Sequence, residues 1–336
     1  MNIRKDAILF GGTSAEKLVS VATAQNLGRY LSTAIFYFWN DQDMIVEVEK
    51  DELMTFEGLF VKIFEPKTKP SLSLDEFFTL AEKNLFVFLA LHGGRGENGW
   101  IQKKLEDKKI PFSGSGSVAS ALCMDKARAK AVLKKHEIKV PDEFLFHGEN
   151  LKPHDLQKFF DKYKKIVVKP VTEGSSRGIF IIKSQEELTV AITQIIALDM
   201  AMLAEEFVGG RELTIGVLST TDGLHALCPS EVVLEPGATF DYEGKYLGRG
   251  SIEITPAKIT DEEKKLAQAV AIKAHEVFGC RGCSRTEIIF NENGYYFLET
   301  NTLPGLTKAS FIPQQLAAED MSMTSFLQIL KEETNQ

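Results

Sequence analysis

The first third of this 336-residue chain alternates short apolar runs with helical stretches, and this alternation limits its possible folds more than any other feature. Strands are predicted at 7–10, 34–39, 59–64 and 86–91, and a helix is predicted from its N-cap Ser14 to about residue 31. Strands that alternate with helices form a parallel sheet covered by helices on both faces. We therefore expect an N-terminal α/β domain that ends near residue 113, after a last strand at 110–112 and the run SGSGS.

The rest of the chain has a less regular order of elements, typical of an α+β region. Helices are predicted at 118–136 and 185–196, and strands at 166–169, 179–183, 200–207 and 213–218. A further helix begins at the capping box Thr260–Glu263 and ends at Gly279, after a long loop at 236–250. The turn at 208–210 separates two units, so we expect domains at 1–113, 114–208 and 209–336.

Charge and composition exclude several classes of protein. Asp and Glu (47) outnumber Lys and Arg (39), and the net charge of −8 argues against nucleic acid or an anionic membrane as a partner. The basic helix face formed by Lys126, Lys130, Lys134 and their neighbours is therefore interpreted as a solvated face with one phosphate ligand. No apolar run approaches the roughly 18 residues of a membrane span. The four cysteines make no disulfide scaffold, and Cys280 and Cys283 lack a second pair, so we expect a cytoplasmic protein.

The segment 285–301 has the pattern of a β-hairpin, because two strands flank the turn residues Asn293 and Gly294. Side chains alternate along a strand, so Arg285 shares a face with Glu287, and Glu299 shares a face with Asn301. A loop of two or four residues would place the two glutamates on opposite faces. A three-residue loop, with glycine in the left-handed conformation, instead pairs Glu287 with Glu299 and Arg285 with Asn301.

The three-residue register would gather two carboxylates, an amide and a guanidinium in one polar patch. Adjacent carboxylates repel each other, and a bound cation removes that repulsion. Oxygen ligands alone favour Mg²⁺, which proteins commonly share with substrate phosphates. The alternative is a solvated hairpin face with no ligand, because exposed strands often carry glutamate.

Three glycine-containing segments lie where a ligand could bind. In 167–178, a strand that ends at Lys169 precedes glycines and serines whose donors could wrap a phosphate, although a surface turn is the alternative. The segment 11–16 lacks the dinucleotide fingerprint, but Glu16 near a helix N-terminus could hold a zwitterion. His92 follows the strand 86–91 at the edge where α/β sheets bind ligands; a hydrogen-bonded loop histidine fits as well.

Together these segments resemble the D-alanine–D-alanine ligases of the ATP-grasp superfamily. The resemblance runs from about Ala7 to Glu332 and rests on seven strings in the family's order: LFGGTSAE, LHGGRGENGWIQ, SGSGSVASALCMDK, VVKPVTEGSSRGI, EEFVGGRELTIGVL, FDYEGKY and LETNTLPGLTKAS. It implies a three-domain ATP-grasp ligase whose N-terminal parallel-sheet domain binds the first substrate. ATP would lie between two antiparallel-sheet domains, the last of which carries the mobile loop and the metal site.

The resemblance also implies roles for individual residues. The expected ATP contacts are Lys126 and Lys169 at the phosphates, Glu205, Glu206 and Val208 at the adenine, Glu212 at the ribose, and Lys245 on the mobile loop. The first amino acid would meet a triad of Glu16, Ser175 and Tyr246 with His92 nearby, and Ser310 would bind the second substrate's carboxylate. Arg285 and the backbone of Gly305 would stabilise the tetrahedral oxyanion. Two Mg²⁺, or Mn²⁺, would be held by Glu287, Glu299 and Asn301.

Three positions depart from the family pattern. Leu18 stands where a glutamate is usual, Asn98 stands where the family's GEDG has aspartate, and Glu287 replaces the aspartate of the metal strand. The glutamate keeps the charge but adds a methylene, so the cation or the hairpin must shift. Leu18 would remove a hydrogen bond near the first substrate, which is a reason to consider other amino acids as substrates.

The leading hypothesis is an ATP-dependent ligase that joins two D-alanines for peptidoglycan precursor synthesis. ATP would convert a carboxylate to an acyl phosphate, which an amine then attacks, while the 236–250 loop excludes water. Tyr246 favours an amine over a hydroxy acid as the second substrate. The alternatives are an ATP-grasp ligase with a different amino acid and an inactive ATP-binding module. The resemblance alone implies a homodimer.

Overall fold

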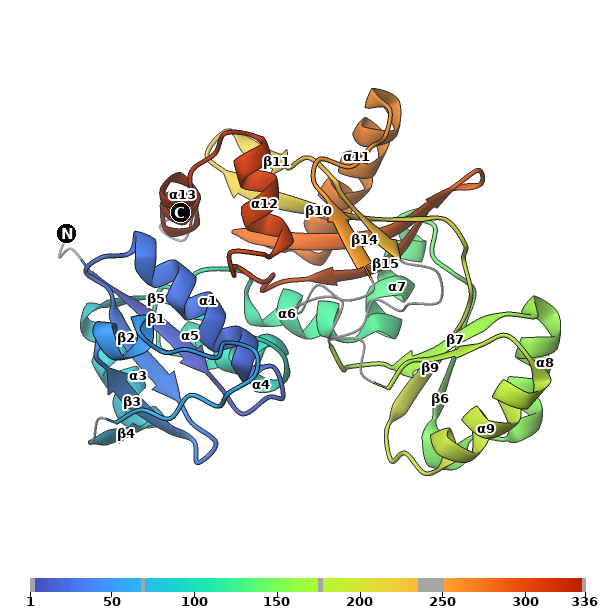
Figure 1. The fold of residues 1–336 in the computed structure, drawn as a ribbon, viewed down its shortest axis with the longest axis horizontal. Coiled ribbons are helices and arrows are strands. Elements are labelled where there is room, and N and C mark those ends of the chain that lie inside the picture. The colour runs from blue at the N-terminus through green and yellow to red at the C-terminus, as the bar shows by residue number, and fades with distance from the viewer. Residues whose placement is uncertain (1–3, 68–69, 175–177, 235–250, 334–336) are drawn as a thin grey trace.

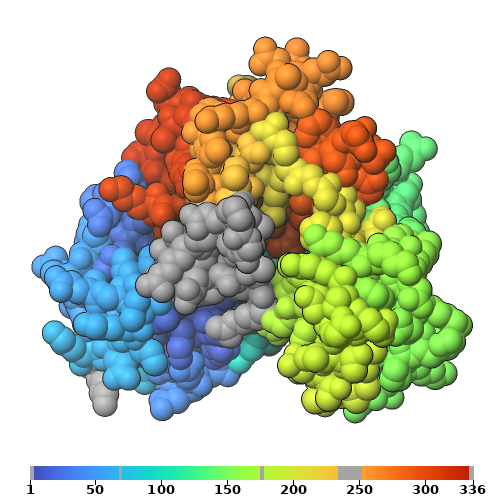
Figure 2. Space-filling model, turned by 45° about the vertical axis from the view of Figure 1, so that its right-hand side comes forward, coloured from blue at the N-terminus to red at the C-terminus, as the bar shows by residue number. Residues whose placement is uncertain are grey.

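The computed structural model describes residues 4–67, 70–174, 178–234 and 251–333, which form three β-sheets with helices packed against them (Figure 1). In the space-filling view of Figure 2, the blue, the green to yellow-green and the yellow-to-red residues form three lobes. Among the described residues, no helix is long and apolar enough to cross a membrane. The expected loop at 236–250, with Lys245 and Tyr246, and also Ser175 lie outside the described residues.

The N-terminal sheet has the strand order β4-β3-β2-β1-β5. Its strands are β1 (Lys5–Gly11), β2 (Ile35–Trp39), β3 (Met44–Val48), β4 (Ser71–Ser73) and β5 (Leu85–Ala90). β1 pairs in parallel with β2 and β5, which confirms the prediction for this part of the sheet, whereas β3 and β4 join as antiparallel strands. Side chains of α1 (Lys17–Tyr30) pack on one face; those of α3 (Leu74–Asn84) and α5 (Trp100–Asp107) pack on the other.

Three details of this lobe differ from the sequence-based expectation. Residues 59–64 are not a strand, because Phe60 has a φ of 66° that interrupts extended backbone. Residues 110–112 provide only an isolated parallel bridge between Phe112 and Val87. Ser14 does not cap α1; its hydroxyl donates to the backbone oxygen of His92, and the helix begins only after Glu16. The sequence pattern missed β3 and β4, as well as α2 (Lys50–Met54) and α4 (Gly94–Glu97).

The middle sheet is antiparallel, with the strand order β6-β9-β7-β8. The expected strands correspond to β7 (Ile166–Pro170), β8 (Phe180–Ile182) and β9 (Ala201–Glu206), and β6 (Glu143–His147) was not expected. α8 (Pro153–Tyr163) and α9 (Gln185–Ile196) bury apolar side chains against this sheet. Ser184 caps α9 by accepting from the N–H of Glu187, so this helix begins where the sequence predicts.

The C-terminal sheet has the order β13-β12-β10-β14-β15, with β11 paired to β10. Its strands are β10 (Arg211–Thr220), β11 (Gly223–Ala226), β12 (Ser230–Leu234), β13 (Ser251–Ile254), β14 (Cys283–Asn291) and β15 (Gly294–Asn301). α11 (Asp261–Phe278) starts at the predicted capping box and ends at Gly279, which has a φ of 65°. Two further helices, α12 (Phe311–Ala318) and α13 (Met323–Glu333), complete the chain.

The helix expected at 118–136 is two helices, α6 (Ser117–Met124) and α7 (Lys126–Lys135). The break occurs at Asp125, whose ψ of 94° is not helical and whose carboxylate accepts from the N–H of Arg128 and so caps α7. Cys123 of α6 and Leu133 of α7 belong to one apolar cluster with Ala274 of α11 and Phe297 of β15. These helices therefore fix Lys126 and Lys130 beside the C-terminal hairpin.

Candidate functional site

The β14–β15 hairpin brings Glu287 and Glu299 directly opposite each other, and it brings Arg285 opposite Asn301. This pairing confirms the predicted register, but the predicted three-residue loop is wrong. Asn291 pairs with Gly294, so the connection has two residues, and an irregularity between Glu287 and Ile288 leaves Leu298 as an extra residue. The β-bulge adds the one-residue shift that the loop does not supply.

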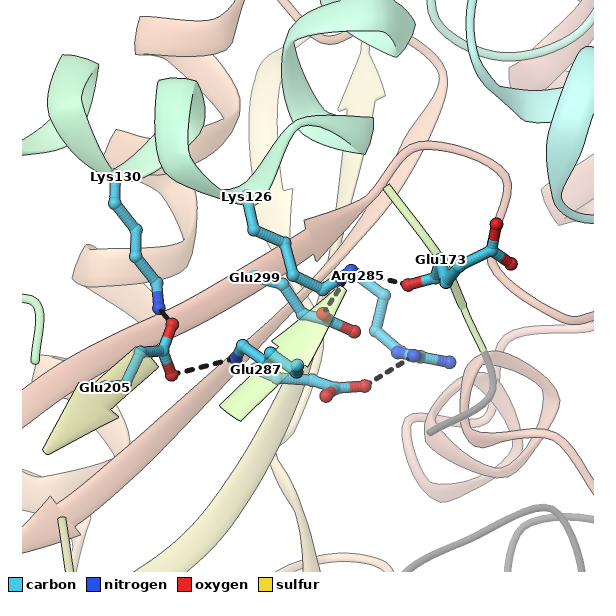
Figure 3. Close-up of polar contacts among 8 residues, drawn as sticks. Lys126, Lys130, Glu173, Glu205, Arg285, Glu287 and Glu299 are labelled. Carbon is cyan, nitrogen blue, oxygen red and sulfur yellow. Dashed lines mark hydrogen bonds and ion pairs between the residues drawn. The ribbon is translucent and has the colours of Figure 1, made fainter. Parts of the chain in front are cut away.

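Each hairpin glutamate faces a protein cation (Figure 3). Nη2 of Arg285 donates to Oε1 of Glu287 at 2.6 Å, and Nζ of Lys126 lies 3.5 Å from Oε2 of Glu299. Lys126 also donates to the backbone oxygen of Glu173 at 2.7 Å. Oδ1 of Asn301 accepts from the N–H of Leu303 at 2.8 Å. The carboxylates therefore lie in a mostly buried, charge-compensated patch and not on a solvated face.

A second charged group lies beside the hairpin, around Glu205 of β9. Its Oε2 is 2.9 Å from Nζ of Lys169 on β7, and its Oε1 pairs with Nζ of Lys130 on α7. Burial alone would raise the pKa of Glu205, but Lys169 and Lys130 outweigh it and lower that pKa. Burial likewise opposes the charged form of Lys169, yet Glu205 and Glu299 raise its pKa. Lys169 is therefore a cation and Glu205 an anion.

Between the middle and C-terminal sheets lies a cavity of about 890 Å³. Its lining includes six of the predicted nucleotide residues: Lys126, Lys169, Glu205, Glu206, Val208 and Glu212. Apolar side chains such as Ile181, Val232 and Ile289 line it as well, and Glu287 and Glu299 stand on its wall. A cavity lined by both apolar side chains and charged groups, lysines among them, suits a nucleotide, whose base is apolar on its faces and whose phosphates are anionic.

A smaller cavity of about 90 Å³ adjoins the first, with which it shares Lys126, Glu173, Gly174 and Glu299. Its lining includes the predicted substrate and catalytic residues Glu16, His92, Arg285, Asn301, Gly305 and Ser310. The hydroxyl of Ser310 accepts from the N–H of Thr307 at 3.1 Å. The small cavity is thus lined by many polar groups, and Lys126 and Glu299 belong to the lining of both cavities.

His92 is buried, with its Nε2 2.9 Å from the hydroxyl of Thr23. Burial lowers the pKa of His92 to about 4, although a hydrogen bond with the backbone of Leu303 opposes this effect. The imidazole is therefore neutral near pH 7. It serves as a hydrogen-bonding group and not as a fixed positive charge.

Sequence reasoning missed Glu97, which lies at the end of α4 and lines the small cavity. One carboxylate oxygen accepts from the N–H of Gly93 at 3.0 Å. Burial, and next the neighbouring charge of Glu16, raises the pKa of Glu97 to about 7. The signal in the sequence was the string GENG at 96–99, which places a carboxylate five residues after His92.

Sequence reasoning also misjudged Lys130, which has no exposed surface although its helix face was interpreted as solvated. Lys126 and Lys130 are four residues apart, so they lie on the same side of α7. That side faces β9 and β15, whereas Lys134 is partly exposed. Because Lys134 has the same spacing and is partly exposed, the spacing alone does not indicate which lysine is buried; the packing of α7 against β9 decides it.

Two family models match the chain. The model described as D-ala D-ala ligase N-terminus matches residues 5–115, and the model described as D-ala D-ala ligase C-terminus matches residues 132–332. Among curated proteins, the D-alanine–D-alanine ligase of Leptospira interrogans is 34% identical over 346 residues, with 95% of each chain covered.

Two solved structures share the fold. The VanG D-Ala:D-Ser ligase from Enterococcus faecalis has a TM-score of 0.80 at 27% identity, covering 99% of this chain and 100% of that one. The D-alanine–D-alanine ligase from Bacillus anthracis complexed with ATP has a TM-score of 0.74 at 23% identity, covering 99% of this chain and 97% of that one.

Proposed function

Since this chain belongs to the D-alanine–D-alanine ligase family, it is an ATP-dependent ligase of peptidoglycan precursor synthesis, and we propose how its residues perform the reaction. The observation that carries the proposal is the meeting of the two cavities at Lys126 and Glu299, beside Arg285 and Glu287. ATP would occupy the large cavity, and the amino acids would occupy the small one. The reacting phosphate and carboxylate would then meet where the charges gather.

The nucleotide roles follow from charge and position. Lys126 and Lys169 present ammonium groups that can contact phosphate oxygens at the inner end of the large cavity. Glu205, Glu206 and Val208 lie along β9 and the turn after it, where their polar atoms can bond the adenine edge. Glu212 on β10 would accept from the ribose hydroxyls. Lys245 is proposed as a further ATP contact from the family resemblance alone.

Mg²⁺ fits the donor set of Glu287, Glu299 and Asn301, because all three offer oxygen atoms and the two carboxylates are directly opposite across the hairpin. Without a shared metal ion, two adjacent carboxylates need other positive charges beside them. Arg285 and Lys126 supply these charges here. When bound, Mg²⁺ would neutralise phosphate charge during transfer. Two ions are proposed from the family resemblance, with Mn²⁺ as a possible substitute.

The chemistry needs two steps. A carboxylate oxygen of the first D-alanine attacks the γ-phosphorus of ATP, which gives an acyl phosphate and releases ADP. The amine of the second D-alanine then attacks the acyl carbon, and inorganic phosphate leaves as the amide bond forms. Arg285 and the N–H of Gly305 would stabilise the negative oxygen of the tetrahedral intermediate.

Substrate positioning is assigned to the other residues of the small cavity. Glu16, with Ser175 and Tyr246, would form the triad over the first amino acid, and neutral His92 would orient that substrate by hydrogen bonding. Ser310 would bind the carboxylate of the second amino acid. We add Glu97 to this set, because its carboxyl group lines the same cavity.

We also propose a domain organisation, an oligomeric state and a cellular location. We place domain boundaries after residues 113 and 208, and we expect a homodimer in the bacterial cytoplasm. Gel filtration with light scattering of the full chain would test the dimer. Limited proteolysis would test the two boundaries.

A second candidate differs in the acceptor amino acid. The likeness to VanG D-Ala:D-Ser ligase favours D-serine in place of the second D-alanine, with the same acyl phosphate chemistry. Leu18, which departs from the family pattern close to Glu16, also argues for testing other amino acids.

The function is tested by coupling ADP release to a spectrophotometric signal with ATP, Mg²⁺ and D-alanine. We expect ADP and the dipeptide to form in equal amounts, and the Arg285→Ala variant to serve as the inactive control. Turnover with D-alanine no greater than that of the control would refute the primary proposal. Turnover only when D-serine is added would establish the second candidate instead.

A further inference from the structure

Lys130 lies in the middle of α7 with a relative exposure of 0%, which is rare for lysine unless its charge is paired. Figure 3 shows its side chain extending from the helix to Glu205. The second oxygen of that carboxylate contacts Lys169 at 2.9 Å. Lys130, Glu205 and Lys169 therefore form a buried charge triad in which one carboxylate is shared by two ammonium groups.

The two lysines of the triad differ in access to a ligand. Lys169 lines the large cavity, whereas Lys130 lines neither the large nor the small cavity described above. Among the described residues, Glu205 links Lys130 to the large cavity, because Glu205 both pairs with Lys130 and lines that cavity. A second carboxylate that acts on Lys130 is Glu143 of β6, which lies opposite Glu205 in the sheet and is 3.4 Å from Lys134.

We propose that Lys130 is a positioning residue for nucleotide binding. It neutralises Glu205 through the carboxylate oxygen that Lys169 does not contact, and it thereby leaves the positive charge of Lys169 available to the phosphates of ATP. The proposal rests on the nucleotide role assigned to Lys169 above.

The charge balance of the triad explains the effect. Two ammonium groups and one carboxylate leave a net charge of +1 beside the large cavity. Without Lys130, Glu205 and Lys169 would form a neutral pair, and Lys169 would have to leave a buried carboxylate unpaired in order to bind a phosphate. An unpaired buried charge is costly, so the pair would resist the nucleotide.

The protonation state of Lys130 allows a second test of the proposal. Burial, and next the charge of Lys169, lowers the pKa of Lys130 to about 8, although Glu205 and Glu143 favour its charged form. Lys169 has the opposite shift because Glu299 and Glu287 act on it as well as Glu205. Deprotonation of Lys130 near pH 8 should therefore weaken ATP binding, while an arginine at this position would stay charged.

The test compares Lys130→Met, Lys130→Arg and, as a matched control on the same helix, Lys134→Met, whose side chain is 44% exposed. We expect Lys130→Met to raise the KM for ATP by roughly tenfold, with little change in kcat or in the KM for D-alanine. Lys134→Met should leave the KM for ATP near the wild-type value. In the wild type the KM for ATP should rise between about pH 7 and about pH 9, and Lys130→Arg should abolish this rise.

The opposite outcomes are equally definite. If Lys130 only ties α7 to β9, Lys130→Met will lower the melting temperature while the KM for ATP stays unchanged, and the proposal is overturned. If Lys130→Met does not fold, the pH profile of Lys130→Arg decides, because an unchanged rise of KM with pH rejects the proposal. A wild-type enzyme without ligase activity would refute the proposed function and not the role of Lys130.

Discussion

Glu97 provides the sharpest test of whether the small cavity is buried and acidic, because this environment raises the pKa of its carboxyl group from an ordinary 4.5 to about 7. A folded protein that holds a proton more tightly than its unfolded chain loses stability as pH rises through that interval. The difference between 4.5 and about 7 corresponds to about 3 kcal/mol for a fully buried group. Part of the residue surface remains in water, so we expect about 2 kcal/mol.

Glu97→Gln removes the titrating group and keeps an oxygen that can accept from the N–H of Gly93. Relative to the wild type, the free energy of unfolding of Glu97→Gln should therefore increase by about 2 kcal/mol between about pH 5 and about pH 8. Both tryptophans of the chain, Trp39 and Trp100, are stacked in the lobe that contains Glu97. Tryptophan fluorescence during urea denaturation thus reports on the unfolding of this lobe.

The control is Glu82→Gln, at an exposed position of α3 in the same lobe. Its stability should follow that of the wild type across the whole pH range. If wild type and Glu97→Gln instead give parallel profiles, Glu97 titrates as it does in water. The reasoning from burial and from the neighbouring Glu16 would then be wrong.

Three further changes test the reaction and the core. Arg285→Ala should lower kcat with D-alanine by about 10²- to 10³-fold, as expected for loss of an oxyanion donor, and stopped-time product analysis measures this. Glu299→Gln should raise the Mg²⁺ concentration needed for half-maximal activity by at least about tenfold, and an unchanged Mg²⁺ titration would contradict the metal assignment. Gln315→Leu should lower the free energy of unfolding by about 2–4 kcal/mol in urea denaturation. The buried amide of Gln315 accepts from the N–H of Gly216 and donates to the oxygens of Thr214 and Ser230. A loss under about 1 kcal/mol would mean that those groups find other partners.

Local sequence signals identified several elements of the fold correctly. The apolar runs of β1, β2 and β5 predicted a parallel arrangement, and a capping box marked the start of α11. In these elements the signal depends on neighbouring residues alone, either through side-chain periodicity or through a cap that bonds within one turn. The hairpin pattern at 285–301 also predicted the charged groups Arg285, Glu287 and Glu299.

Other elements could not be predicted because distant contacts decide them. β3 and β4 are short antiparallel strands that exist only by pairing with β2 and each other. The break at Asp125 places α6 and α7 against α11 and β15, which no local pattern indicates. Charge in the sequence predicted a solvated Lys130, whereas packing of α7 against β9 buried it beside Glu205.

The hairpin separates the two kinds of information most clearly. The order of residues along 285–301 determined that Arg285 shares a strand face with Glu287, and Glu299 with Asn301, because strand geometry alternates regardless of context. Whether those two faces coincide depended on a bulge near Leu298, where the paired strands depart from simple alternation. The sequence therefore predicted which chemical groups the hairpin presents. Their position beside the lysines of α7 and β7 was decided by the tertiary structure, because long-range packing fixes the distances between these elements.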